Sequence, residues 1–230
     1  MALSQSGDAI SIALADLNLQ FGDIPLFLDI EPANTMGEIS QNIARLDSMF
    51  LMSALTKHAS GIYVLAPPNH PEEAKAVTPD HTKQILSLMQ EMFDYIVIDS
   101  NRSLDQNTLM ALQVSEIIFV VTHLELASLK NANRLVSICA NMGYNESKIR
   151  LVINRYEKRR DISLNEAEEV LGEKAYWLIP NDYSSVISSI NQGKSVLLTA
   201  NGSRVTKSFR EMASRIQGKK SGRRRFLGLF

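Results

Sequence analysis

The sequence predicts an α/β protein, built on a doubly wound and mostly parallel sheet with helices on both faces. Two observations predict this class. Short β-branched runs are continuously apolar rather than alternating, as in strands that are buried on both faces. Between these runs, the apolar period changes to that of a helix. The predicted strands cover residues 9–15, 62–66, 95–99, 117–122, 149–154 and 176–179.

Helices are expected where apolar residues recur three or four positions apart. Such stripes run through residues 39–50, 85–92 and 129–139. A capping box of Ser163 and Glu166 starts a further helix, which Gly172 is placed to end. The sequence contains no internal repeat, and no Pro/Gly/Ser-rich linker appears before residue 218. We therefore expect one domain over residues 1–217, followed by a tail over residues 218–230.

Composition excludes several classes of protein. Hydrophobic residues make up 45% of the 230 positions and charged residues 21%, which excludes a disordered or fibrous chain. The single cysteine, Cys139, can form no internal disulfide, and the four histidines are too scattered to suggest a metal site. No apolar run approaches the ~18 residues of a membrane span, and the first residues lack a secretory signal. We expect a cytoplasmic protein.

Charge is distributed unevenly. Residues 204–230 hold nine Lys or Arg against one acid, Glu211, and so carry a net charge of +8. The whole chain has a net charge of −1, so the other 203 residues carry −9. A basic tail on an acidic body indicates that the tail meets a negative surface, either lipid or nucleic acid.

Polar residues follow the predicted strands. In a doubly wound sheet, ligands bind where the chain leaves the carboxyl ends of the strands. The residues found there are Asp16, Asp99, Thr122, Asn154 and Pro180. Two carboxylates, a hydroxyl and an amide at one edge suit a site for phosphate, magnesium and a base. The alternative is that Asp and Asn at these positions only turn loops and cap helices.

The usual phosphate-binding motif, G-x-x-x-x-G-K-[ST], does not occur in the 230 residues. The one candidate is Gly193-Lys194-Ser195, but Ser188 stands where the first glycine is required, and a helical segment rather than a strand precedes it. We interpret Gly193 as the end of that helix.

Four blocks of the sequence, in order, resemble the CpaE/TadZ proteins of Flp (tight adherence) pilus assembly, a branch of the ParA/MinD ATPases. The blocks are DLNLQFGD at 16–23, FDYIVID at 93–99 with SLD at 103–105, VINRY at 152–156 and IPNDY at 179–183. The resemblance covers residues 1–217. In that family, a strand, a deviant P-loop and a helix precede the segment that matches residues 2–7. It therefore implies a ParA/MinD-like P-loop NTPase fold missing its first strand and P-loop, and without the family's receiver-like domain. Either the gene has lost this part, or the sequence is a fragment.

The resemblance implies roles for the first two strand ends. Asp16 is expected near the magnesium site, and Asp99 matches the carboxylate that holds Mg²⁺ through water. Asn18 stands where relatives commonly have an aspartate that orients the attacking water. A neutral amide can neither accept the proton nor serve as an anionic ligand. The expected catalytic set is therefore empty.

The resemblance implies a nucleotide base at the other strand ends. Asn154 matches the residue whose amide reads adenine, with Arg155 beside it, and Pro180 and Asp182 fall on the loop that lines the base. Turn chemistry explains that loop equally well. ATP or ADP with Mg²⁺ is the family's cofactor. Without the lysine, the loop and the acidic residue, this chain alone is expected to bind it weakly or not at all, and not to hydrolyse it.

The tail combines cations with large apolar residues, after an apolar stripe at 205–216 that predicts a docked last helix. It resembles the membrane-targeting segment of MinD-like proteins, and reversible attachment to an anionic membrane follows from cations worth about 1 kcal/mol each. A solvated tail and, less favoured, nucleic-acid binding stay open. The expected membrane residues are Lys219, Lys220, Arg223, Arg224, Arg225, Phe226, Leu227, Leu229 and Phe230.

The resulting hypothesis is a degenerate ParA/MinD-type scaffold for pilus assembly, peripheral at the inner membrane and at a cell pole. Its expected partners are pilus and secretion proteins and a second copy or a P-loop-bearing partner. Two alternatives stay open. An in-frame Gly-rich loop with lysine upstream of Met1 would indicate an active ATPase. Salt-sensitive retention on DNA would indicate a partitioning protein.

Overall fold

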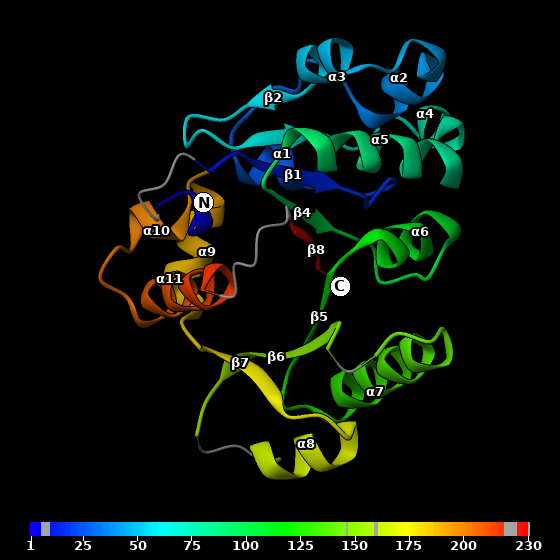
Figure 1. Ribbon diagram of the computed structural model, residues 1–230. Coiled ribbons are helices and arrows are strands. Elements are labelled where there is room, and N and C mark those ends of the chain that lie inside the picture. Colours follow the sequence, from blue (N-terminus) through cyan, green and yellow to red (C-terminus); the bar gives the residue numbers. More distant parts are fainter. Residues whose placement is uncertain (6–9, 146, 159–160, 219–224, 230) are drawn as a thin grey trace.

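One eight-stranded sheet forms the centre of the protein (Figure 1). The computed structural model describes residues 1–5, 10–145, 147–158, 161–218 and 225–229, the last five by their backbone. The strand order is β2-β3-β1-β4-β8-β5-β6-β7, and every pairing is parallel except that of β2 with β3. The strands are β1 (Ile12–Asp16), β2 (Thr56–Lys57), β3 (Tyr63–Leu65), β4 (Tyr95–Asp99), β5 (Ile117–Thr122), β6 (Ile149–Tyr156), β7 (Ala175–Pro180) and β8 (Arg225–Leu229). The predicted α/β class is confirmed.

Helices cover both faces of the sheet (Figure 1). One face carries α2 (Met36–Gln41), α3 (Ser48–Ala54), α4 (Pro71–Ala76), α5 (Pro79–Met92), α6 (Gln106–Val114), α7 (Leu126–Asn141) and α8 (Leu164–Leu171). The other carries α1 (Ile24–Phe27), α9 (Tyr183–Asn191), α10 (Val196–Thr199) and α11 (Arg204–Gln217). Two short 3-10 helices, η1 (Leu3–Gln5) and η2 (Ile43–Arg45), complete the described elements.

The apolar core consists of three clusters. On the first face, residues of α2, α3 and α5 pack on β1 and β4, whereas residues of α7 and α8 pack on β5 and β6. Helix α6 contributes to both, with Ala111 in one and Leu112 in the other. On the second face, α11 buries Val205, Ala213 and Ile216 against the sheet, as the apolar stripe predicts.

Local signals explain several helix ends. The predicted capping box of Ser163 and Glu166 is confirmed, because each side chain accepts a hydrogen bond from the backbone of the other residue. Gly172 ends α8 at φ +67, in the left-handed region that glycine adopts without steric strain. Gly193 follows α9 at φ +60, so it lies at a helix end, as predicted.

The prediction of one helix through residues 39–50 is wrong. The chain forms α2, then η2, then α3. A polar side chain within this stretch accepts a hydrogen bond from the backbone and so divides the predicted helix. Asp47 accepts a hydrogen bond from the backbone N–H of Phe50 and so starts α3 as a new helix. The first strand is also shorter than predicted and begins at Ile12; residue 9 lies outside the described residues.

The segment expected as a tail enters the sheet. Arg225–Leu229 forms β8 between β4 and β5, parallel to both. Residues 219–224 and 230, which include Lys219, Lys220, Arg223, Arg224 and Phe230 of the expected membrane set, lie outside the described residues. The expected boundary at residue 217 therefore leaves out a strand of the sheet. This strand includes the backbone of four expected membrane residues, Arg225, Phe226, Leu227 and Leu229.

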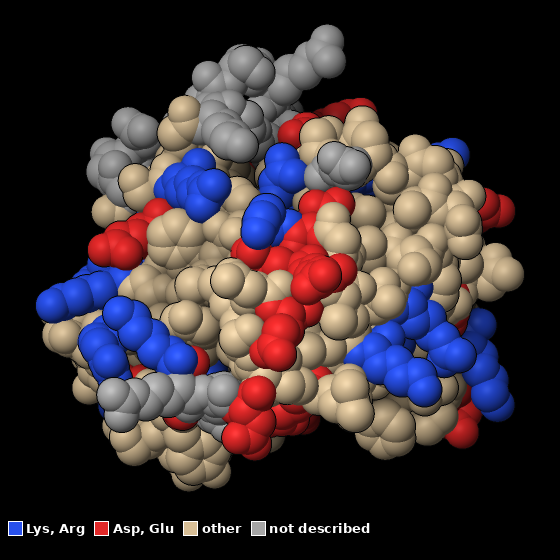
Figure 2. Space-filling model, turned by 90° about the horizontal axis from the view of Figure 1, so that it is seen from below, with Lys and Arg blue, Asp and Glu red and all other residues tan. Residues whose placement is uncertain are grey.

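The surface carries charges of both signs. Figure 2 views the molecule from the end at which Figure 1 shows α8, and acidic side chains form a band there between groups of Lys and Arg. Exposed Glu166 and Glu169 of α8 belong to the acidic excess of the body. Within the described part of the chain, none of the helices has the length and apolar character needed to cross a membrane.

Candidate functional site

The parallel strands bring their carboxyl ends to one edge of the sheet. Asp16 ends β1 and Asp99 ends β4, and the two are register partners on neighbouring strands. The backbone N–H of Leu17 donates to the carbonyl of Asp99 at 2.7 Å, which fixes the chain where it leaves β1. His123 follows β5, and Arg155 and Pro180 lie at the ends of β6 and β7. The predicted common edge is confirmed.

Asp16 is fully buried and holds the loop that follows it. Its two carboxylate oxygens accept hydrogen bonds from the backbone N–H of Asn18, at 3.0 Å, and of Ile24, at 3.2 Å. A side chain at Gly22 would bring its Cβ to 2.5 Å from Asp16 Oδ2 and 2.6 Å from Pro67 Cγ, so the loop can close over the carboxylate only with glycine there. Asp99 is exposed and is the carboxylate of the pair that a cation in solvent can reach.

Both carboxyl groups hold their protons more tightly than usual. Burial raises the pKa of Asp16 to about 6; the two backbone hydrogen bonds lower this pKa, and the charges of Asp99 and Asp23 raise it further. Burial also raises the pKa of Asp99. Of the two, Asp99 is the carboxylate whose oxygens could serve as ligands for a divalent cation.

Asn18 forms a local turn. Its Nδ2 donates to the carbonyl of Phe21 at 2.8 Å, and its Oδ1 accepts from the N–H of Phe21 at 3.3 Å. Both halves of the amide are thus engaged by one backbone residue. This local use explains the residue by turn chemistry.

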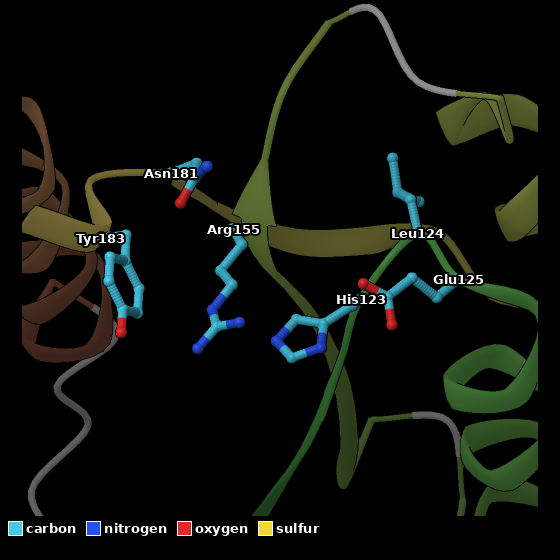
Figure 3. A pocket seen from close by; sticks show the side chains of 6 residues that line it. All are labelled: His123, Leu124, Glu125, Arg155, Asn181 and Tyr183. Carbon is cyan, nitrogen blue, oxygen red and sulfur yellow. The ribbon is translucent and has the colours of Figure 1, made fainter.

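A cavity of about 320 Å³ opens at the ends of β5, β6 and β7. Figure 3 shows Arg155 and His123 projecting into the same space, with Tyr183 on the side of α9 and Leu124 and Glu125 on the side of α7. The cavity is lined by His123, Leu124, Glu125, Arg155, Asn181 and Tyr183. Its size is at the lower end of small-molecule sites.

Two features aim polar groups into this cavity. Arg155 has φ +50 and lies where the pairing of β6 with β7 shifts register, so an irregular backbone turns its side chain toward the space. Its guanidinium lies 5.8 Å from the ring centre of Tyr183. Asn181 donates through Nδ2 to Glu157, while its buried Oδ1 accepts no hydrogen bond from the described residues. A buried acceptor without a donor is rare and marks a place where a ligand can donate.

The predicted base-binding residues divide into two groups. Arg155 lines the cavity. Asn154, Pro180 and Asp182 do not: the amide oxygen of Asn154 accepts from the N–H of Arg155, and Asp182 caps α9 by accepting from the N–H of Ser185. Asn181 was not among the predicted residues, although it lies between two of them. Residues 123–125 were not predicted either, although they directly follow a predicted strand and the same strand-end rule could have found them.

Known proteins resemble this chain in sequence and in fold. No family model matches the chain. The septum site-determining protein MinD of Thermotoga maritima is 28% identical over 224 residues, which cover 94% of this chain and 80% of that protein. A ParA family ATPase from Chlorobium tepidum has a similar structure, with a TM-score of 0.87 and 26% identity over 94% of this chain and 88% of that chain. The chain is therefore similar in sequence and in fold to ATPases of the ParA/MinD type.

Solved structures of lower sequence identity share the same fold. The MinD protein of Pyrococcus horikoshii, solved in complex with Mg-ADP, matches with a TM-score of 0.79 at 20% identity over 94% of this chain and 86% of that chain. At that identity the likeness shows the shared fold. In the described part of this chain, no three His, Cys, Asp or Glu side chains lie close enough together to hold a metal ion.

The pKa of Asp16 predicts how stability depends on pH. The unfolded group titrates near 3.8 and the folded group near 6, so the unfolded state loses the proton first and stability falls as pH rises between these values. At 1.36 kcal/mol per pKa unit, the loss is about 3 kcal/mol and is complete above about pH 7. Asp16→Asn cannot ionise, although it loses one hydrogen bond at every pH.

Urea unfolding of wild type and Asp16→Asn checks this prediction. Between about pH 3 and about pH 7, the unfolding free energy of wild type should fall by about 3 kcal/mol relative to that of Asp16→Asn. A difference that stays constant across this range would show that the burial of Asp16 does not raise its pKa.

Proposed function

We propose that this chain is a ParA/MinD-type scaffold protein of Flp pilus assembly that binds a magnesium nucleotide weakly and does not hydrolyse it alone. The observation that carries the nucleotide half is the cavity at the ends of β5–β7, on the same edge as Asp16 and Asp99. The likeness to a MinD solved with Mg-ADP supports the choice of ligand. The pilus half depends on the four ordered sequence blocks at 16–23, 93–105, 152–156 and 179–183.

The residues present can take different parts of such a ligand. The free Oδ1 of Asn181 suits the amino group of adenine, and Arg155 can lie against the base or its ribose. Asn154, Pro180 and Asp182 act one step away, through the backbone that carries Arg155 and Asn181. Mg²⁺, held by Asp99 through water, would neutralise phosphate charge.

The distance between these groups fits one nucleotide. Three strand spacings separate β4 from β6 in the order β4-β8-β5-β6, which is roughly 14 Å at about 4.8 Å per spacing. The described part of the chain places no lysine or glycine-rich loop between them. The protein would contact the base at one end and Mg²⁺ at the other, with few contacts to the phosphates. This pattern supports weak binding and no turnover.

Location and partners extend the proposal. The tail would attach reversibly to the anionic inner membrane, placing the protein in the cytoplasm next to the membrane and at a cell pole. A second copy and components of the pilus secretion machinery would be its protein partners.

Nucleotide binding is measured by titration of the full chain with ATP or ADP and Mg²⁺, followed by NMR. We expect a Kd on the order of 1 mM and no steady release of phosphate. Removing the acceptor in Asn181→Ala should weaken binding about 2- to 10-fold, as for one hydrogen bond. Arg155→Ala should also weaken it.

Matched controls are Asn131→Ala and Arg134→Ala, which remove the same groups from exposed positions of α7. These should bind as wild type does. Absence of any shift at millimolar nucleotide would contradict the ligand, and steady phosphate release would instead support an active ATPase.

The pilus assignment is checked in the source bacterium. Deleting the gene should abolish surface Flp pili and leave septum placement unchanged, because a scaffold acts only in the assembly that it organises. Misplaced septa with normal pili would overturn the proposal in favour of a role in septum placement, the role for which the MinD relatives are named.

A further inference from the structure

Strand β8 lies in the interior of the sheet, with four strands on one side and three on the other. It pairs with all of β4, from Tyr95 with Arg225 to Asp99 with Leu229. Its last three residues, Leu227–Leu229, pair with Ile117–Phe119 of β5. Among the described residues, no ladder joins β4 directly to β5. The two halves of the sheet are therefore connected through β8.

The edges that β8 joins lie in the core. Ile96 and Ile98 of β4 are buried in the cluster shared with α2, α3 and α5, and Ile118 and Val120 of β5 are buried in the cluster shared with α7 and α8. Backbone groups left unpaired in such surroundings destabilise the fold, because they lose their hydrogen bonds to water and gain none in the protein. The space between β4 and β5 therefore needs a strand, which it recognises through backbone hydrogen bonds, as in peptide recognition by strand addition.

The segment that fills this space suits it at one register position. Gly228 occupies the register position between Ile98 and Ile118, so this row of the sheet receives no third side chain between two buried isoleucines. Glycine suits a place where neighbouring groups already fill the space.

The same segment belongs to the basic and apolar end of the chain, which an anionic membrane attracts. A backbone that is paired on both sides inside a sheet cannot at the same time lie on a lipid surface. We propose that the space between β4 and β5 is a strand-binding site that Arg225–Leu229 occupies reversibly, and that an anionic membrane competes with the sheet for this segment. The competition rests on the membrane attachment proposed above; the strand-binding site does not.

Cysteine trapping in the full chain tests the site. In a Cys139→Ser background, the register pairs Val97→Cys with Leu227→Cys and Ile117→Cys with Leu227→Cys place thiols on β8 and on each neighbour. Mild oxidation should cross-link most of the protein in both variants, because both pairs adjoin in the sheet. Two pairs from opposite sides keep the test valid if one variant does not fold.

The matched control is Val97→Cys with Leu229→Cys, which is offset by two residues along the same ladder. It should cross-link much less than the register pair. Equal yields in register and out of register would show a segment that samples all positions, and would overturn the strand-binding site.

Vesicle co-sedimentation tests the competition. Reduced Val97→Cys/Leu227→Cys protein should sediment with vesicles of phosphatidylglycerol and phosphatidylcholine, and the oxidised, locked form should lose this binding. Equal sedimentation of both forms would overturn the competition. If the variant cross-links in register on oxidation but its reduced form does not sediment, the membrane attachment fails while the strand-binding site stands.

Discussion

The ladders that β8 forms with β4 and β5 are the interaction on which the arrangement of the site depends. Among the described residues, each half of the sheet has its own helices and its own apolar cluster on one face, and α6 and the second face link the two halves elsewhere. By pairing with both inner edges, β8 sets the separation and direction of the two halves. The carboxylates at the end of β4 and the cavity at the end of β5 thus share one edge.

This arrangement divides the candidate site into two parts. On one side, the loop over Asp16 presents Asp99 to solvent beside a buried carboxyl group that holds its proton up to about pH 6. On the other, the strained backbone of Arg155 and the free acceptor of Asn181 face a cavity of the size that a small ligand fills. We expect a nucleotide to bind weakly and remain intact, because the protein would contact its base and its Mg²⁺ but make few contacts with its phosphates.

Much of the fold could be predicted because local patterns and tertiary structure agree. Continuously apolar runs gave the central strands, and the capping box at Ser163 placed α8 to the residue. Residues 39–50 could not be predicted, since the side chain of Asp47 offers the backbone a new helix start that apolar period alone does not reveal.

At the site, the strand-end rule found the edge, but which amide faces the cavity depends on the register shift between β6 and β7, which no local pattern encodes. The tail was harder still, because its charge is typical of a surface segment and its partners lie far away in sequence. Leu227 pairs with Val97 of β4, 130 residues earlier, and with Ile117 of β5, 110 residues earlier.

Amide hydrogen exchange of the unmodified chain tests most directly whether the C-terminal segment closes the sheet. The N–H groups of residues 226–229 should exchange on the order of a thousandfold more slowly than in an unstructured peptide, and about as slowly as those of β4 and β5. Exchange of these four amides at the unstructured rate, with β4 and β5 still protected, would contradict the account.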